Sequence, residues 1–167
     1  AQQNQGSPIF MYVFPILSGV AGYFIFSLLM ASILYLVLTL TGSRASRLKI
    51  GNNVAWAMVP FGLRELVKFF VIGFSKKLIE YPGLSNLVDA QAGGFIAWLR
   101  GVLGYFDIYW LLFVVLLVIG AIQVSGLKQR KAVTATLIAA LIMLLLLGIP
   151  SLVGSLFGGL SVSGASF

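Results

Sequence analysis

The chain has 167 residues, of which 60% are hydrophobic and 9% are charged, and its mean hydropathy is +1.06. Soluble domains are about half apolar and about a quarter charged. A soluble fold of this size is excluded, because it could not bury so much apolar surface, and the composition predicts an integral membrane protein. The lack of cysteine and histidine excludes disulfides, thiolate or imidazole metal sites and histidine-ligated haem, so we expect no cofactor.

The net charge of +7 would suggest a nucleic acid partner in a soluble protein. Here the eleven basic residues are few and lie between apolar runs, so we expect no nucleic acid contact. The excess of lysine and arginine is typical of the cytoplasmic loops of membrane proteins. The expected partners are therefore membrane lipids and other membrane protein subunits.

Apolar runs predict the first two helices. The charge-free run 13–40 predicts a spanning helix, because about 20 residues are needed to cross a bilayer. A short basic loop follows, and Asn52 and Asn53 offer N-cap chemistry for the next helix. The run 54–74 predicts a bent membrane helix, since Pro60 lies inside it.

The second half of the chain begins with its least hydrophobic stretch, 75–107. Within it, 90–106 carries aromatic residues at helical spacing, which predicts an interfacial helix, with a re-entrant helix or a soluble cap as alternatives. The runs 108–127 and 132–153 predict two more spanning helices. The expected fold is an all-α, polytopic transmembrane helix bundle with about four spanning helices plus one interfacial or re-entrant helix.

We expect three sections along the chain: a polar lead-in over 1–12, a transmembrane domain over 13–153 and a Gly/Ser-rich tail over 154–167. The positive-inside rule places the basic loops 44–49 and 128–131 together on the cytoplasmic face of a bacterial inner membrane. An even number of crossings then separates the two loops. Both ends of the sequence are expected outside the cytoplasm, which predicts either a further helix upstream of the first residue or an amino terminus that was itself translocated.

The two basic loops are candidate contacts for anionic lipid headgroups. Each lysine or arginine near an anionic membrane surface contributes about 1 kcal/mol of attraction. The alternative is that these residues only set the orientation of the protein. The residues are Arg44, Arg47, Lys49, Lys128, Arg130 and Lys131.

Three charges in one turn of the 54–74 helix form the main candidate site. A charge near the bilayer centre costs about 2.5–3.5 kcal/mol, so Arg64, Glu65 and Lys68 need partners or water. Glu65 and Lys68 are three residues apart on one helix face and can pair. The group predicts a polar pathway or a lipid-phosphate site. The alternative is that the helix is shifted and the charges reach an interface.

Asp107, just before the 108–127 helix, is either a proton or cation site or a charge favourable to the helix dipole, acting as an N-cap. The sequence has four carboxylates, which are scattered along it, and no histidine to serve as a base for a serine. It also has no GxxxxGK[ST] phosphate-binding motif. We therefore expect a protein that is not an enzyme.

The stretch from Phe106 to Ala132, FDIYWLLFVVLLVIGAIQVSGLKQRKA, resembles the late helices of bacterial Yip-domain (Yip/Yif-like) integral membrane proteins. NVAWAMVP at 53–60 and YPGLSNLV at 81–88 are similar to the middle of that family, and the resemblance covers residues 13–153. Members of the family have five spanning helices, a cytoplasmic amino terminus and a carboxyl end outside. The four expected here fit that plan if the first helix is absent from this sequence.

The resemblance implies a role without catalytic residues. Eukaryotic members are linked to small GTPases and membrane traffic, and bacterial members resemble accessory subunits, some beside ABC-type exporters. We therefore expect a non-enzymatic accessory or scaffold subunit of a larger membrane protein assembly, with an ABC-type exporter as a candidate. One alternative is a small oligomeric transporter or channel with a polar site at Arg64, Glu65 and Lys68. The other is a structural subunit of a respiratory or photosynthetic complex.

Overall fold

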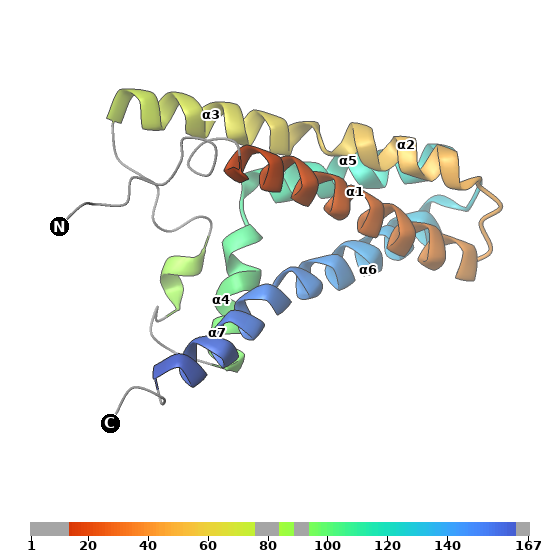
Figure 1. Ribbon diagram of the computed structural model, residues 1–167. Helices are drawn as coiled ribbons and strands as arrows, with labels where there is room; N and C mark the ends of the chain where they lie inside the picture. Colours follow the sequence, from red (N-terminus) through yellow and green to blue (C-terminus); the bar gives the residue numbers. More distant parts are fainter. Residues whose placement is uncertain (1–13, 76–83, 89–93, 163–167) are drawn as a thin grey trace.

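The computed structural model describes residues 14–75, 84–88 and 94–162, and all regular structure within these ranges is helical (Figure 1). The expected all-α class is confirmed for this part of the chain. The predicted lead-in and the last five residues of the predicted tail lie outside it. In chain order the elements are α1 (Phe14–Leu40), α2 (Arg47–Ala57), α3 (Val59–Ser75), the 3-10 turn η2 (Ser85–Leu87), α4 (Phe95–Tyr105), α5 (Ile108–Val124), α6 (Gln129–Leu147) and α7 (Ile149–Val162).

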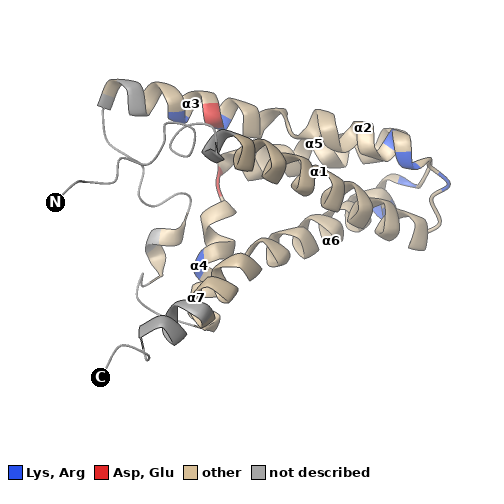
Figure 2. Ribbon diagram, in the orientation of Figure 1, with Lys and Arg blue, Asp and Glu red and all other residues tan. Residues whose placement is uncertain are grey.

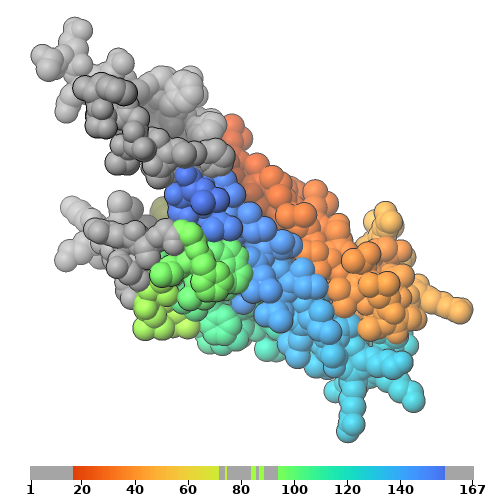
Figure 3. Space-filling view, turned by 90° about the horizontal axis from the view of Figure 1, so that it is seen from below, coloured from red at the N-terminus to blue at the C-terminus, as the bar shows by residue number. Residues whose placement is uncertain are grey.

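The helices form two rows that diverge from one end of the molecule. Figure 1 shows α2 and α3 following one another along one row, and α6 and α7 along the other. The rows meet where the α1–α2 and α5–α6 turns lie, and α1 packs against both α2 and α6. At the open end α4 packs against α7, and the space-filling view in Figure 3 shows α6 between α1 and α4.

The core lies where the two rows meet. Met30, Leu34 and Leu38 of α1 are fully buried, and their spacing of four residues places them on one helix face. They belong to one apolar cluster with Phe113 and Leu117 of α5. The buried face of α6 is rich in alanine, and such small residues let membrane helices approach closely.

The outer surface is strongly apolar, as expected of a membrane protein. The segments Leu17–Leu40 and Gln129–Leu156 are long and apolar enough to cross a membrane. Phe95–Tyr105 and Ile108–Val124 would form a third crossing if the pair, bent by 69°, is one span. The described part of the chain thus supports two to three spans, and the four that were predicted are not confirmed.

The predicted helix 54–74 is two helices, and its predicted start is wrong. α2 already begins at Arg47, because Ser46 is the N-cap and accepts a hydrogen bond from the backbone of Lys49 at 3.4 Å. The helix breaks at Met58, since Pro60 has no N–H with which to continue the backbone ladder.

Asn53 joins helices instead of capping one. It lies within α2, is 9% exposed, and donates from Nδ2 to the carbonyl of Leu117 in α5 at 3.2 Å. Gly120 provides the space, because a Cβ at that position would overlap the Asn53 amide. The predicted caps at Asn52 and Asn53 are therefore wrong, and Asn53 fixes α2 against α5.

The predicted helix 132–153 continues well past its predicted end. α6 breaks at Gly148, and α7 then runs to Val162, so the predicted Gly/Ser-rich tail begins inside a helix. Pro150 is the second residue of α7 and lies in its first turn, where a missing backbone N–H costs little.

α4 packs tightly on the α6–α7 break and is shorter than the predicted 90–106 helix, of which 90–93 lie outside the described residues. Trp98 donates from its indole nitrogen to the carbonyl of Leu145 at 3.1 Å. A Cβ on Gly148 would lie 2.7 Å from the Trp98 ring, so this glycine permits the close contact. α5 likewise ends at Val124, three residues before its predicted end.

Candidate functional site

A buried hydrogen bond brings the two basic segments to the same end of the molecule. Ser43 donates from its hydroxyl to the carbonyl of Ser125 at 2.7 Å, and the two residues are 8% and 3% exposed. This bond ties the α1–α2 turn to the α5–α6 turn. Figure 2 shows lysine and arginine gathered at this end, which we call the basic end.

The basic residues lie more on helices than in loops, contrary to prediction. Arg47 and Lys49 occupy the first turn of α2, and Arg130 and Lys131 the first turn of α6. All are exposed, and none forms an ion pair with a carboxylate in the described part of the chain. The full set at the basic end is Arg44, Arg47, Lys49, Lys128, Arg130 and Lys131.

These cations lie at helix amino termini, where a positive charge is least favourable. The amino-terminal end of a helix carries a partial positive charge, and a cation there is unfavourable by roughly 0.3–1 kcal/mol. Neither α2 nor α6 has an acidic residue in its first turn. Helix stability therefore does not explain the basic end, which is suited to meet anions outside the protein.

The predicted group on α3 is a connected set of ion pairs. Lys68 Nζ lies 2.9 Å from Glu65 Oε1, which confirms that these two residues pair. Arg64 Nε lies 3.1 Å from the same oxygen, and Arg64 Nη1 lies 3.4 Å from Asp107 Oδ2. We call these four residues the charge cluster, and Figure 2 shows its acidic members on α3 and at the start of α5.

Asp107 has two roles, of which only one was predicted. Its Oδ1 accepts the backbone N–H of Trp110 at 2.8 Å, so the predicted N-cap of α5 is confirmed. Its Oδ2 pairs with Arg64, from which it is 43 positions away in sequence. No local pattern indicates this second contact, because it arises from the packing of α3 on α5.

α3 has the polarity of a helix in an apolar environment. The side chains of Arg64 and Lys68 are 19% and 31% exposed, whereas Phe69 and Phe74 are 71% and 88% exposed. Burial raises the pKa of Glu65, but the hydrogen bond and charge of Lys68 and the charge of Arg64 lower it further, so this pKa lies below its ordinary value. Glu65 is therefore ionised at neutral pH.

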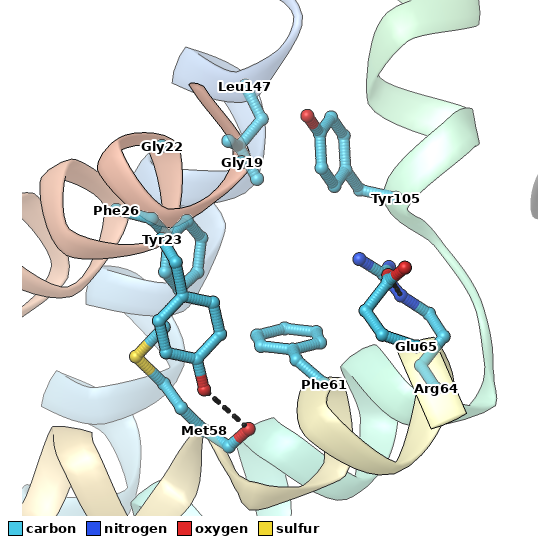
Figure 4. Close-up of a pocket in the computed structure, with 10 residues that line it drawn as sticks. All are labelled: Gly19, Gly22, Tyr23, Phe26, Met58, Phe61, Arg64, Glu65, Tyr105 and Leu147. Atoms are coloured by element: carbon cyan, nitrogen blue, oxygen red, sulfur yellow. Dashed lines mark hydrogen bonds and ion pairs between the residues drawn. The ribbon is translucent and has the colours of Figure 1, made fainter. Parts of the chain in front are cut away.

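A cleft with a volume of about 460 Å³ lies beside the charge cluster (Figure 4). It is open because Gly19 and Gly22 of α1 have no side chains, and a Cβ at either position would meet nothing within 4 Å. Arg64 and Glu65 line it from α3. The other lining residues are Tyr23, Phe26, Met58, Phe61, Tyr105 and Leu147.

Aromatic packing joins the cleft wall to the apolar core. The Phe61 ring stacks on Phe113 with centroids 5.0 Å apart and meets Phe26 edge to face at 5.6 Å. Tyr23 donates from its hydroxyl to the carbonyl of Met58 at 3.1 Å, which links α1 to the α2–α3 junction. The walls on α1 and α3 are thereby fixed to each other, and the sequence motifs contained no signal for this cleft.

The comparisons with known proteins identify no protein similar to this chain. A scan against protein-family models finds no match, and neither a search of curated proteins nor a search of solved structures finds one. The resemblance to Yip-domain proteins therefore stays a prediction. Among the described residues, no three or more of His, Cys, Asp and Glu group together as a metal site.

Proposed function

We propose that this protein is a non-enzymatic integral membrane subunit that serves as a scaffold in a larger membrane protein assembly. The proposal rests on the exposure of aromatic side chains in the second half of α3. It extends past the neighbouring helices (Figure 1) and exposes Phe69, Phe70 and Phe74 by 71%, 56% and 88%. Exposed aromatic side chains on a helix are suited to anchor a partner.

We propose that the basic end lies at the cytoplasmic face of a bacterial inner membrane, as the positive-inside rule predicts. α6 becomes apolar at Ala132, and Leu147 of the same helix lies in the cleft wall. The length of helix between these two residues is about 22 Å. The hydrocarbon core is about 30 Å thick. The cleft and the charge cluster therefore lie in the half of the bilayer opposite the basic end, about 8 Å short of the far boundary. Long arginine and lysine side chains can extend over such a distance, which supports the alternative that Arg64 and Lys68 reach an interface.

This placement leaves the end of α3 without cover from the other described residues. The residues after Lys68 continue towards and past the far boundary, where polar headgroups and water replace acyl chains. Large apolar side chains are unfavourable there unless another protein packs on them. We propose that an apolar helix of a different membrane subunit covers Phe69, Phe70 and Phe74. An ABC-type exporter is a candidate source of that helix, given the Yip-like resemblance.

Photo-crosslinking in native membranes tests this docking surface. A photoreactive residue at Phe74 is expected to form an adduct with one different protein, identified by mass spectrometry. The matched control is Leu36, which is 59% exposed on α1. F69A/F70A/F74A is expected to abolish copurification of that protein. Adducts with lipid alone, with a second copy alone, or equally from Leu36 would contradict the scaffold role.

Transport through an oligomer is a second candidate, favoured by the cleft beside Arg64, Glu65 and Lys68. Charged groups beside a broken helix mark the substrate sites of many transporters, and the break between α2 and α3 at Met58 lies six residues before Arg64. Solute flux into liposomes that contain the purified protein, lost in R64Q, would favour transport over the scaffold role.

A further inference from the structure

We propose that the cleft between α1 and α3 binds the headgroup of a zwitterionic phospholipid, with the phosphate at Arg64 and the ammonium group at Glu65. Both residues line the cleft, and Figure 4 shows the Arg64 guanidinium and the Glu65 carboxylate beside each other at the same wall. A ligand that carries both charges can satisfy both groups.

The charge balance of the cluster selects a dipolar ligand. Arg64 and Lys68 are matched by Glu65 and Asp107, so the cluster as a whole has no net charge. A simple anion at Arg64 would be repelled by the exposed Glu65 carboxylate, and a simple cation at Glu65 would be repelled by Arg64 and Lys68. A headgroup with phosphate and ammonium avoids both costs, since each charge meets its opposite.

Both residues retain bonding capacity. The two bonds that Glu65 makes to described residues end on Oε1, and its side chain is 60% exposed. Arg64 has five N–H donors, and its bonds to described residues, one to Glu65 and one to Asp107, start from Nε and Nη1. A phosphate and an ammonium group can therefore bind without breaking the cluster.

The lining around the charges suits a lipid better than a soluble zwitterion. Tyr105 and Tyr23 present aromatic rings, which attract ammonium groups, while Phe26, Phe61 and Leu147 are apolar. The rest of the outer face of α1 is apolar too, with Leu17, Val20 and Phe24 between 51% and 65% exposed. Acyl chains can lie along this face, and the volume of about 460 Å³ is within the range of ligand pockets.

Native mass spectrometry of the purified full chain carrying K128Q/R130Q/K131Q, which weakens phosphatidylglycerol binding at the basic end, tests the proposal, with phosphatidylethanolamine and phosphatidylglycerol added at equal concentrations. We expect roughly tenfold preference for phosphatidylethanolamine, since one charged hydrogen bond separates the two headgroups. E65Q is expected to remove this preference or reverse it towards phosphatidylglycerol. Soluble glycerophosphoethanolamine, added as a competitor, should not displace the lipid. Displacement would mean that the site takes the soluble zwitterion and would overturn the lipid assignment.

G22L provides a variant that fills the cleft without disturbing the core. Its side chain enters open space, and leucine favours a helix more than glycine does. The matched control is G51L, whose Cβ also meets nothing within 4 Å but which lies in α2, outside the cleft. We expect G22L to lose phosphatidylethanolamine binding at least tenfold and G51L to retain it. Equal binding of phosphatidylethanolamine by both variants, or equal affinity of the K128Q/R130Q/K131Q chain for both lipids, would overturn the proposal.

Discussion

The two ends of the molecule use charge in opposite ways. At the basic end six cations are exposed, and in the described part of the chain no carboxylate pairs with them. At the cleft two cations and two carboxylates contact one another, and Arg64 and Asp107 are mostly buried. The basic end must be neutralised by its surroundings, whereas the charge cluster is neutralised by the protein itself. Substitutions at the basic end should therefore change lipid attraction, and substitutions in the charge cluster should change folding stability.

The largest effect is expected from removing three cations at the basic end. K128Q/R130Q/K131Q should weaken the attraction of phosphatidylglycerol by roughly 3 kcal/mol, because each lysine or arginine contributes about 1 kcal/mol at an anionic surface. This corresponds to about a hundredfold lower association constant, measured by native mass spectrometry. The loss should shrink at high salt, since exposed charges are screened.

K68Q serves as the matched control, because it removes one cation from the cluster at the far end. It should leave the association of phosphatidylglycerol with the basic end unchanged. An equal loss of phosphatidylglycerol in K68Q and in the triple variant would show that net charge alone, and not its position, governs lipid attraction.

A smaller effect, on stability, is expected at Asp107. D107A removes the N-cap of α5, worth about 1 kcal/mol, and leaves Arg64 without one partner, worth about another 1 kcal/mol. Reversible unfolding in mixed micelles, followed by tryptophan fluorescence, should show a loss of about 2 kcal/mol. R130A at the basic end should change stability by less than about 0.5 kcal/mol.

D107N separates the two roles of this residue. Asparagine caps a helix as well as aspartate does, so D107N should lose only the ion pair with Arg64 and about half of the stability that D107A loses. If D107N is as unstable as D107A, the ion pair carries the whole effect and the cap contributes nothing.

Local patterns predicted the helices better than they predicted the contacts between them. The helix in the run 13–40 and the cap at Asp107 could be predicted because both depend on neighbouring residues alone. The start of α2 was misplaced, since Ser46 and the Asn pair are chemically equivalent caps in sequence. The role of Asn53 depends on Gly120 in another helix, so no local rule could have found it.

The site was predictable in part for the same reason. Glu65 and Lys68 are within one turn, so their pairing followed from helix geometry. The contact between Arg64 and Asp107 and the opening at Gly19 and Gly22 required the packing of α1, α3 and α5. A glycine in an apolar helix indicates a close approach or an open space equally well, and only the fold distinguishes Gly120 from Gly22.

The smallest effect on stability is expected at Lys68. It tests how much the exposed ion pair between Lys68 and Glu65 contributes to the stability of the charge cluster. Lys68 and Glu65 are 31% and 60% exposed, so water screens their ion pair, and K68M should cost only about 0.3 kcal/mol. The pKa of Glu65 lies below its ordinary value, so the contribution is present at neutral pH and is lost as the pH falls through that lowered pKa. The same unfolding measurement at neutral and acidic pH should therefore show a small difference between K68M and the native chain that vanishes in acid.

A loss as large as that of D107A would mean that Lys68, and not Asp107, holds Arg64 and Glu65 in place. The far end would then be sensitive to its solvent-facing charges, and the contrast with the basic end would disappear.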